Sequence, residues 1–230
     1  MIGPSPRYLK EAGYTVMWWG KNDLLAPDAF PSSVTSATSI GGTGEGDNAF
    51  AFGEAGYYSF LNTAMEGAAE ETPDGRNVMA AIEFLQSGPA EPFMIFLPLT
   101  KPHPPYTAPE PFYSAVDPEK LPPLRPAAGE GKPDYHRLIR EYRNLTALDD
   151  GFFRRLHAVY LGSVAFMDFL FGLLMAAVEE NGFANSTTTV VFADHGDYAG
   201  DYGLVEPAPR NASRTGWKAG EAVRPGVVLR

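Results

Sequence analysis

The chain has 230 residues, of which 44% are hydrophobic and 20% are charged, a balance typical of folded globular proteins rather than disordered ones. Its 18 basic and 28 acidic residues give a formal net charge of −10, which argues against nucleic acid as a partner because a negative protein repels polyphosphate. The sequence contains no cysteine, which excludes disulfides, thiolate metal sites and a cysteine nucleophile within this chain.

Helices and apolar strands are predicted to alternate along the chain. The helices are expected over residues 6–12, 77–85 and 160–180, and the strands over 14–19, 93–99 and 187–193. Continuous apolar runs are typical of strands buried on both faces, and their alternation with helices favours parallel pairing. We therefore predict an α/β fold, a three-layer α/β/α sandwich around a mainly parallel central sheet.

The most apolar stretch of the chain, residues 164–178, is expected to be a buried helix. It contains Asp168 and is shorter than the roughly 20 residues that a membrane-spanning helix needs. The first residues show no signal-peptide pattern, so the sequence does not predict a compartment. We expect no membrane span.

Polar side chains that can carry chemistry follow each predicted strand. Lys21 comes after the first strand, Lys101 and His103 after the second, and Asp194 and His195 after the third. Because the carboxyl ends of parallel strands meet at one edge of a sheet, we expect all of them in one crevice. Asp194 and His195 offer ligands to a cation such as Ca²⁺ or Mg²⁺. His103, held between prolines, can contact an anionic oxygen or donate a proton to a leaving group.

Each cluster also has an ordinary structural interpretation when it is taken alone. Asp194 and Asp197 can be solvated loop acids, Asp197 can also cap a helix, and Lys21 can be a surface lysine. His136 and His157 lie in helical or charged surroundings, and we interpret both as structural. The order of the clusters along the chain therefore carries more information than any one of them.

That ordered set resembles the type I sulfatases of the alkaline-phosphatase-like superfamily. The motifs are Gly20-Lys21, Lys101-Pro102-His103-Pro104-Pro105, Asp194-His195-Gly196-Asp197 and Gly203-Leu204. The resemblance extends from about Tyr8 to Val205. It implies a sulfuric ester hydrolase in which a formylglycine attacks the sulfur of a sulfate ester and a divalent cation, usually Ca²⁺, binds the sulfate oxygens.

The resemblance also assigns roles to individual residues. Asp194 and His195 match the metal ligands of the family. Lys21 and His103 match catalytic sulfate contacts, with His103 as the candidate proton donor to the leaving alcohol, and Lys101 is a further candidate for substrate binding. The expected substrate is a small sulfate ester or a sulfated glycan, and relatives are often secreted, periplasmic or lysosomal.

Several departures from the family pattern predict an incomplete catalytic domain. Asp23 stands where relatives often have histidine, and residues 4–7 do not reproduce the Cys/Ser-x-Pro-x-Arg motif that supplies the formylglycine. The family's first strand, with its paired metal-binding aspartates, is expected before residue 1.

We therefore expect residues 1–205 to form a partial catalytic domain and residues 206–230 to form a divergent, irregular tail, which we attribute to an altered reading frame or a gene-model error. Such a chain is predicted to be inactive alone and to bind Ca²⁺ weakly. Two alternatives stay open: a phosphatase or phosphonate-ester hydrolase of the same superfamily, and a non-catalytic anion- or carbohydrate-binding protein on the same fold.

Overall fold

The computed structural model describes residues 5–38, 45–127 and 131–206, which form two compact units. Unit 1 comprises the described residues of Met1–Gly44, Gly67–Lys101 and Met167–Ala184. Unit 2 comprises those of Glu45–Glu66, Pro102–Phe166 and Asn185–Arg230. Apart from Glu206, the predicted tail after Val205 lies outside the described residues.

The helices and strands occupy the following ranges. The strands are β1 (Thr15–Trp19), β2 (Ser36–Thr38) and β3 (Phe93–Phe96). The helices are α1 (Ser5–Glu11), α2 (Phe30–Ser33), α3 (Pro73–Gln86), α4 (Asp134–Tyr142) and α5 (Asp150–Glu180). Short 3-10 turns lie at Pro27–Ala29, Tyr57–Ser59, Ala69–Glu71, Pro118–Lys120, Leu145–Ala147 and Asp201–Gly203.

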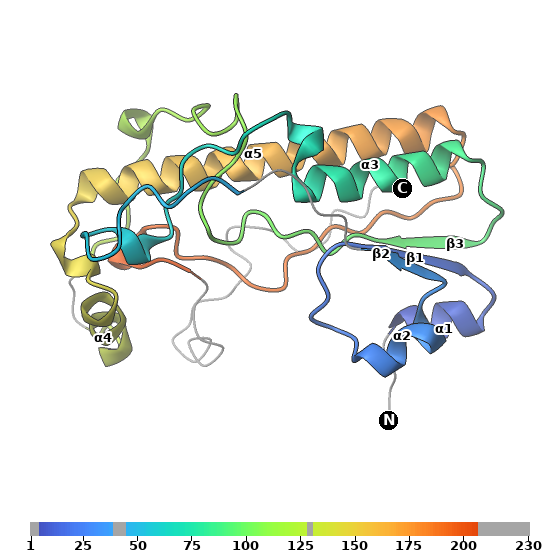
Figure 1. Cartoon of the computed structure of the whole chain (residues 1–230), viewed down its shortest axis with the longest axis horizontal. Helices are drawn as coiled ribbons and strands as arrows, with labels where there is room; N and C mark the ends of the chain where they lie inside the picture. Colours follow the sequence, from blue (N-terminus) through green and yellow to red (C-terminus); the bar gives the residue numbers. More distant parts are fainter. Residues whose placement is uncertain (1–4, 39–44, 128–130, 207–230) are drawn as a thin grey trace. The chain divides into compact units, whose positions relative to one another are not determined.

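Unit 1 contains a parallel sheet with the strand order β2-β1-β3 (Figure 1). The helices α1 and α2 lie on one face, where Val16 and Trp18 of β1 pack against Phe30 of α2. On the other face Trp19 of β1 contacts Phe84 of α3, with ring centroids 5.8 Å apart. Helix, sheet and helix thus form the predicted three layers, and the parallel α/β class is confirmed.

Local sequence explains where the elements of unit 1 begin and end. α1 stops before Gly13, whose φ of +91° lies in the left-handed region that favours glycine at a helix end. α3 begins after Thr72, whose hydroxyl accepts a hydrogen bond of 3.0 Å from the backbone N–H of Gly75. β2 was not predicted, because its three residues are exposed and small and show no apolar pattern.

Helix α5 has 31 residues and begins ten residues before the predicted start at Tyr160. By length and composition it is long enough and apolar enough to cross a membrane, and a third of its most apolar stretch is buried. The length of the predicted apolar stretch therefore does not by itself exclude a span. The expected absence of one stays a prediction, supported by Leu156, Phe166 and Leu170, which are fully buried against protein.

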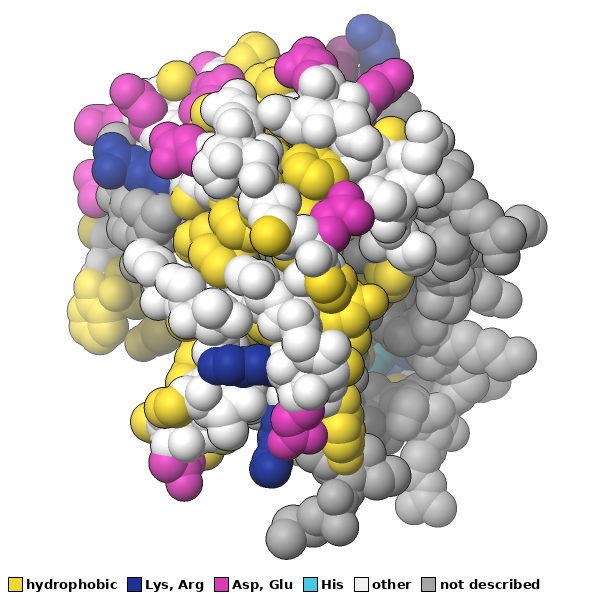
Figure 2. Space-filling model, turned by 90° about the vertical axis from the view of Figure 1, so that its right-hand side faces the viewer, with side chains coloured by type: hydrophobic (Ala, Val, Ile, Leu, Met, Phe, Trp, Pro, Cys, Tyr) yellow, Lys and Arg dark blue, Asp and Glu magenta, His cyan; other side chains and the backbone are white. Residues whose placement is uncertain are grey.

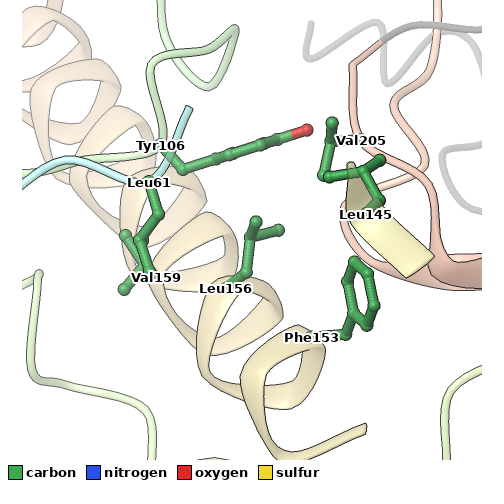
Figure 3. Close-up of a cluster of buried hydrophobic side chains, with 7 residues drawn as sticks. All are labelled: Leu61, Tyr106, Leu145, Phe153, Leu156, Val159 and Val205. Atoms are coloured by element: carbon green, nitrogen blue, oxygen red, sulfur yellow. The ribbon is translucent and has the colours of Figure 1, made fainter. Parts of the chain in front are cut away.

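Unit 2 is organised around the N-terminal half of α5 rather than around the sheet. Phe153, Leu156 and Val159 of this helix pack against Leu61, Tyr106, Leu145 and Val205 in one buried cluster (Figure 3). Isolated bridges pair residue 61 with 106 and 65 with 109, which holds two long loops side by side. This cluster includes Tyr106, three residues after His103, and Val205, which follows the loop of Asp194 and His195.

The predicted third strand over residues 187–193 is wrong. Its residues form no strand with β1, β2 or β3, and Val190, Val191 and Phe192 are 60%, 50% and 66% exposed. The run has the composition of a buried strand, but a strand also needs a hydrogen-bonded neighbour and a covering layer. Within the described residues only Thr189 of this segment takes part in a β-bridge, and Val190, Val191 and Phe192 stay largely exposed.

The surface carries both charge and exposed apolar side chains. Figure 2 shows acidic side chains and hydrophobic side chains side by side on one face. Large apolar residues such as Leu24 and Phe52 are 57% and 79% exposed. Scattered apolar exposure of this kind is ordinary for globular proteins and assigns no function by itself.

Candidate functional site

Lys21 and Lys101 follow neighbouring parallel strands of unit 1. The backbone N–H of Lys21 donates to the carbonyl of Pro98 over 2.9 Å, so the chain leaving β1 contacts the chain leaving β3. Between them, Gly20 has a φ of +132°, and a Cβ there would crowd the carbonyl of Pro98. The carboxyl ends of β1 and β3 therefore meet at one edge, as expected for parallel strands.

The two lysines differ in their surroundings. The Lys21 side chain is half exposed, and its Nζ pairs with Asp23 Oδ2 over 2.8 Å. Lys101 is only 6% exposed, and its backbone N–H donates to Asp74 Oδ2 over 2.8 Å. Asp74 is itself buried on α3 and also accepts from the N–H of Thr100, so helix and loop are fixed to each other. The loop after β3 is thus held by a buried carboxylate that the sequence did not single out.

In unit 2 the structure brings His103 and His195 close together. Their ring centroids are 6.2 Å apart, although the residues are far apart in the sequence. His103 Nδ1 lies 2.7 Å from the carbonyl of Pro104, and His195 Nδ1 lies 3.1 Å from that of Gly196. A carbonyl oxygen only accepts, so in these two contacts each Nδ1 is the donor.

Asp194 stands beside His195 in the same exposed loop. Its Oδ1 accepts from the N–H of His195 over 3.0 Å, and its Oδ2 lies 3.5 Å from His195 Nε2. Asp194 Oδ2 and His195 Nε2, from the two residues that the sequence predicts as cation ligands, therefore lie next to each other. A hard cation such as Ca²⁺ takes six to eight oxygen ligands, however, and the described residues contain no group of three or more His, Asp or Glu arranged to hold one. The residues present thus do not form a complete cation site.

Asp197 has an environment that its sequence position did not reveal. Its Oδ1 accepts from Tyr106 Oη over 2.6 Å and from the N–H of Ala199 over 2.7 Å. Burial raises the pKa of Asp197, while these two hydrogen bonds and the charge of His103 act in the opposite direction. Burial and the neighbouring Asp197 charge also raise the pKa of Tyr106 well above its usual value. Asp197, which the sequence alone allowed to be a solvated loop acid, is therefore a half-buried carboxylate hydrogen-bonded to the core residue Tyr106.

The other two histidines have structural partners, as predicted. His136 on α4 is buried, with Nε2 3.1 Å from the hydroxyl of Tyr198. His157 on α5 places Nδ1 2.8 Å from the carbonyl of Ala199. Both rings support the turn that follows Asp197.

The predicted site residues are divided between the two units. Lys21 and Lys101 belong to unit 1, whereas His103, Asp194 and His195 belong to unit 2. The structure brings together the members of each set. A single crevice that contains all five residues stays a prediction.

Comparison with known proteins decides the family. The model of the Sulfatase family matches residues 6–222, nearly the whole chain. The chain belongs to the sulfatase family. This match extends beyond Val205, where the motifs recognised in the sequence end. The family relationship agrees with the α/β fold and with the order of the motifs along the chain.

Two curated relatives are identical to this chain at about a quarter of the aligned residues. The multifunctional alkaline phosphatase superfamily protein PehA of Trinickia caryophylli is 26% identical over 57% of this chain and 29% of its own length. An arylsulfatase of Clostridium perfringens is 28% identical over 54% of this chain and 26% of its own length. The chain thus spans less than a third of these two relatives.

Solved structures show the same fold. The phosphonate monoester hydrolase SpPMH of Silicibacter pomeroyi superposes with a TM-score of 0.63 and 18% identity, covering 88% of this chain and 49% of that one. The phosphonate monoester hydrolase of Agrobacterium radiobacter gives a TM-score of 0.56 and 16% identity, covering 85% and 47%. At this identity the likeness establishes the fold, an alkaline-phosphatase-like α/β arrangement, and the chain corresponds to about half of each structure.

Proposed function

We propose that this chain supplies part of the active site of a sulfuric ester hydrolase acting on a small sulfate ester or a sulfated glycan. The observation that carries the proposal is the sulfatase-family match over residues 6–222, within which the lysine, histidine and aspartate–histidine motifs occur in order. The chain's geometry supports it in two places: the lysines at the edge of the sheet and the facing histidines of unit 2.

Lys21 and Lys101 are proposed to attract and hold the sulfate group. Cationic side chains at a fixed position stabilise negative charge that develops on the transferred group. Lys101 suits this role because it is buried and its loop is fixed by Asp74, so its position is set before substrate arrives. Lys21 is paired with Asp23, and the sulfate would replace that carboxylate as its partner.

His103 is proposed to protonate the leaving alcohol. Its Nδ1 is engaged with the carbonyl of Pro104, so proton transfer falls to Nε2. Pro102 and Pro104 restrict the backbone on both sides of the ring, which holds the imidazole in one direction. A His103→Gln variant is expected to lower kcat by about 100-fold or more, the usual contribution of a general acid.

Asp194 and His195 are proposed to supply part of a divalent-cation site, with Ca²⁺ as the expected ion. Such an ion would add positive charge next to the sulfate. Within the described residues, no third His, Cys, Asp or Glu is placed to join them in holding an ion. The formylglycine of the family would have to arise from a residue other than a cysteine of this chain, which has none.

A second candidate is a phosphatase or phosphonate-ester hydrolase of the same superfamily. Two solved phosphonate monoester hydrolases share the fold, and one curated relative is a multifunctional alkaline phosphatase superfamily protein. Sulfate and phosphate esters are both tetrahedral anions, so a pocket of lysine, histidine and metal suits either. The third possibility, a non-catalytic protein that binds anions or carbohydrates, would need no nucleophile.

Steady-state kinetics on the protein encoded by the complete gene separate these functions. We expect kcat/KM for p-nitrophenyl sulfate to exceed the values for p-nitrophenyl phosphate and for a phenylphosphonate monoester. A preference for the phosphorus substrates would favour the second candidate, and no turnover of any of them would favour the third. The 230-residue chain alone is expected to turn over none, and measurable aryl sulfate hydrolysis by it would contradict the proposed division of the site.

A further inference from the structure

We infer that Tyr106 and Asp197 are positioning residues, whose hydrogen bond sets the distance between the rings of His103 and His195. The inference rests on the proposed function, because it assigns these two rings to one site. The Tyr106–Asp197 contact cannot be read from the family motifs, and it lies outside the helices and strands. All residues involved belong to unit 2.

Tyr106 is held in the core of unit 2 by both its side chain and its main chain. The side chain is 1% exposed and packs in the cluster of Figure 3, where its hydroxyl points away from α5 towards the segment of Val205. Its backbone N–H donates to the carbonyl of Phe60 over 2.7 Å, and its carbonyl accepts from Asn62 over 3.1 Å. Main chain and side chain are thus both fixed to the core.

The hydroxyl of Tyr106 joins two distant segments at one atom. It donates to Asp197 Oδ1 over 2.6 Å and accepts from the backbone N–H of Glu206 over 2.7 Å. The first contact closes a loop of 91 residues. Asp197 Oδ1 also accepts from Ala199, so the carboxylate is oriented from its own side as well.

Short segments of chain connect this hydrogen bond to the two histidines. On one side only Pro104 and Pro105 separate His103 from Tyr106, and proline rings restrict the intervening backbone. On the other side only Gly196 separates His195 from Asp197. With its ends joined by the Tyr106–Asp197 contact, this arrangement gives the two rings their separation of 6.2 Å.

A purely structural hydrogen bond would stabilise unit 2 without affecting the separation of the rings. The matched control is Tyr113, a partly buried tyrosine of unit 2, whose hydroxyl donates to the carbonyl of Asn62 over 2.9 Å. Tyr113→Phe removes a comparable hydrogen bond and leaves the Tyr106–Asp197 contact in place. The chain has four histidines, so their ring proton signals can be assigned by single substitutions.

The test is proton NMR of the 230-residue chain, measuring the nuclear Overhauser effect between the His103 and His195 rings. We expect this signal in the unsubstituted chain and in Tyr113→Phe, and its loss in Tyr106→Phe. Asp197→Ala, which leaves the hydrophobic cluster intact, is expected to lose it too, while Asp197→Asn keeps it because the amide oxygen still accepts from Tyr106. The signal between His136 and Tyr198, whose ring centroids are 5.5 Å apart, reports that the fold is retained.

An unchanged His103–His195 signal in folded Asp197→Ala and Tyr106→Phe would overturn the inference. Equal loss in Tyr113→Phe would do so as well, because the effect would then reflect general destabilisation. The measurement uses neither metal nor substrate. A failure of the proposed sulfatase activity would therefore leave this result standing, and the two failures can be told apart.

Discussion

Arg154 on α5 anchors the proline-rich segment that precedes α4, and its removal has a cost that can be worked out from the structure. The guanidinium donates four hydrogen bonds of 2.8–3.1 Å to the backbone carbonyls of Pro118, Glu119 and Leu121. Surface connections of this kind are where binding residues are disproportionately found. Arg154 thus links the core helix to a candidate substrate-recognition segment.

The expected loss is smaller than the sum of the four bonds. A hydrogen bond with a charged donor contributes about 1.5–3 kcal/mol, but carbonyls near the surface regain water when the donor is removed. We therefore expect Arg154→Ala to lower the free energy of unfolding by about 2–3 kcal/mol. Arg154→Lys is expected to recover little, because an ammonium group lacks the planar fork that reaches three carbonyls.

Urea unfolding followed by tryptophan fluorescence and circular dichroism measures the loss, provided that both probes give the same transition. Arg155→Ala is the matched control, since Arg155 is the next residue on α5 and is exposed. It is expected to change stability by about 0.5 kcal/mol or less. Trypsin cleavage after Lys120, whose side chain is 85% exposed, should become faster in Arg154→Ala only. Equal stability and equal cleavage in the two variants would refute the reasoning.

Two further predictions concern α5 and α4. A methyl group at Gly162 would overlap the carbonyl oxygen of Phe112, so Gly162→Ala should lower the free energy of unfolding by about 1–3 kcal/mol. A methyl group at Gly172 would meet nothing within 4 Å, so Gly172→Ala should raise the free energy of unfolding by about 0.5–1 kcal/mol. Thermal unfolding of both variants checks this, and the same sign for both would contradict it. Burial, and secondarily the charge of Lys132, lower the pKa of His136, so its contribution to stability is present above about pH 6.5 and is lost as the pH falls through the folded pKa. His136→Gln should flatten the unfolding free energy between pH 7.5 and 5, and an unchanged slope would show that another group is responsible.

The sequence predicted those helices and strands whose limits are set by residues a few positions apart. The run Thr15–Trp19 is a strand, and Gly13 ends the preceding helix, because β-branched and aromatic residues and a left-handed glycine act over a few positions. Strand β2 escaped prediction, since its backbone pairing with β1 depends on the neighbour and not on its own side chains. The segment 187–193 has the composition of a strand, but the structure assigns it a single bridge residue, Thr189, and no strand.

The candidate site shows the same division. The motifs correctly placed Lys21 and Lys101 after neighbouring strands. The approach of His103 to His195 was expected from strand ends, yet the loop of His195 reaches it without a preceding strand. The Tyr106–Asp197 contact had no signal in the sequence, because no local pattern specifies a hydrogen bond that spans 91 residues.

The proposed function predicts that Lys21 of unit 1 and His103 of unit 2 bind the same sulfate ion. A crystal structure of the protein encoded by the complete gene, with sulfate bound, tests it most directly. We predict that one sulfate ion accepts hydrogen bonds from both Lys21 and His103, with Asp194 on the same side of the sheet. Lys21 and His103 at opposite edges, with no sulfate ion shared between them, would contradict the account.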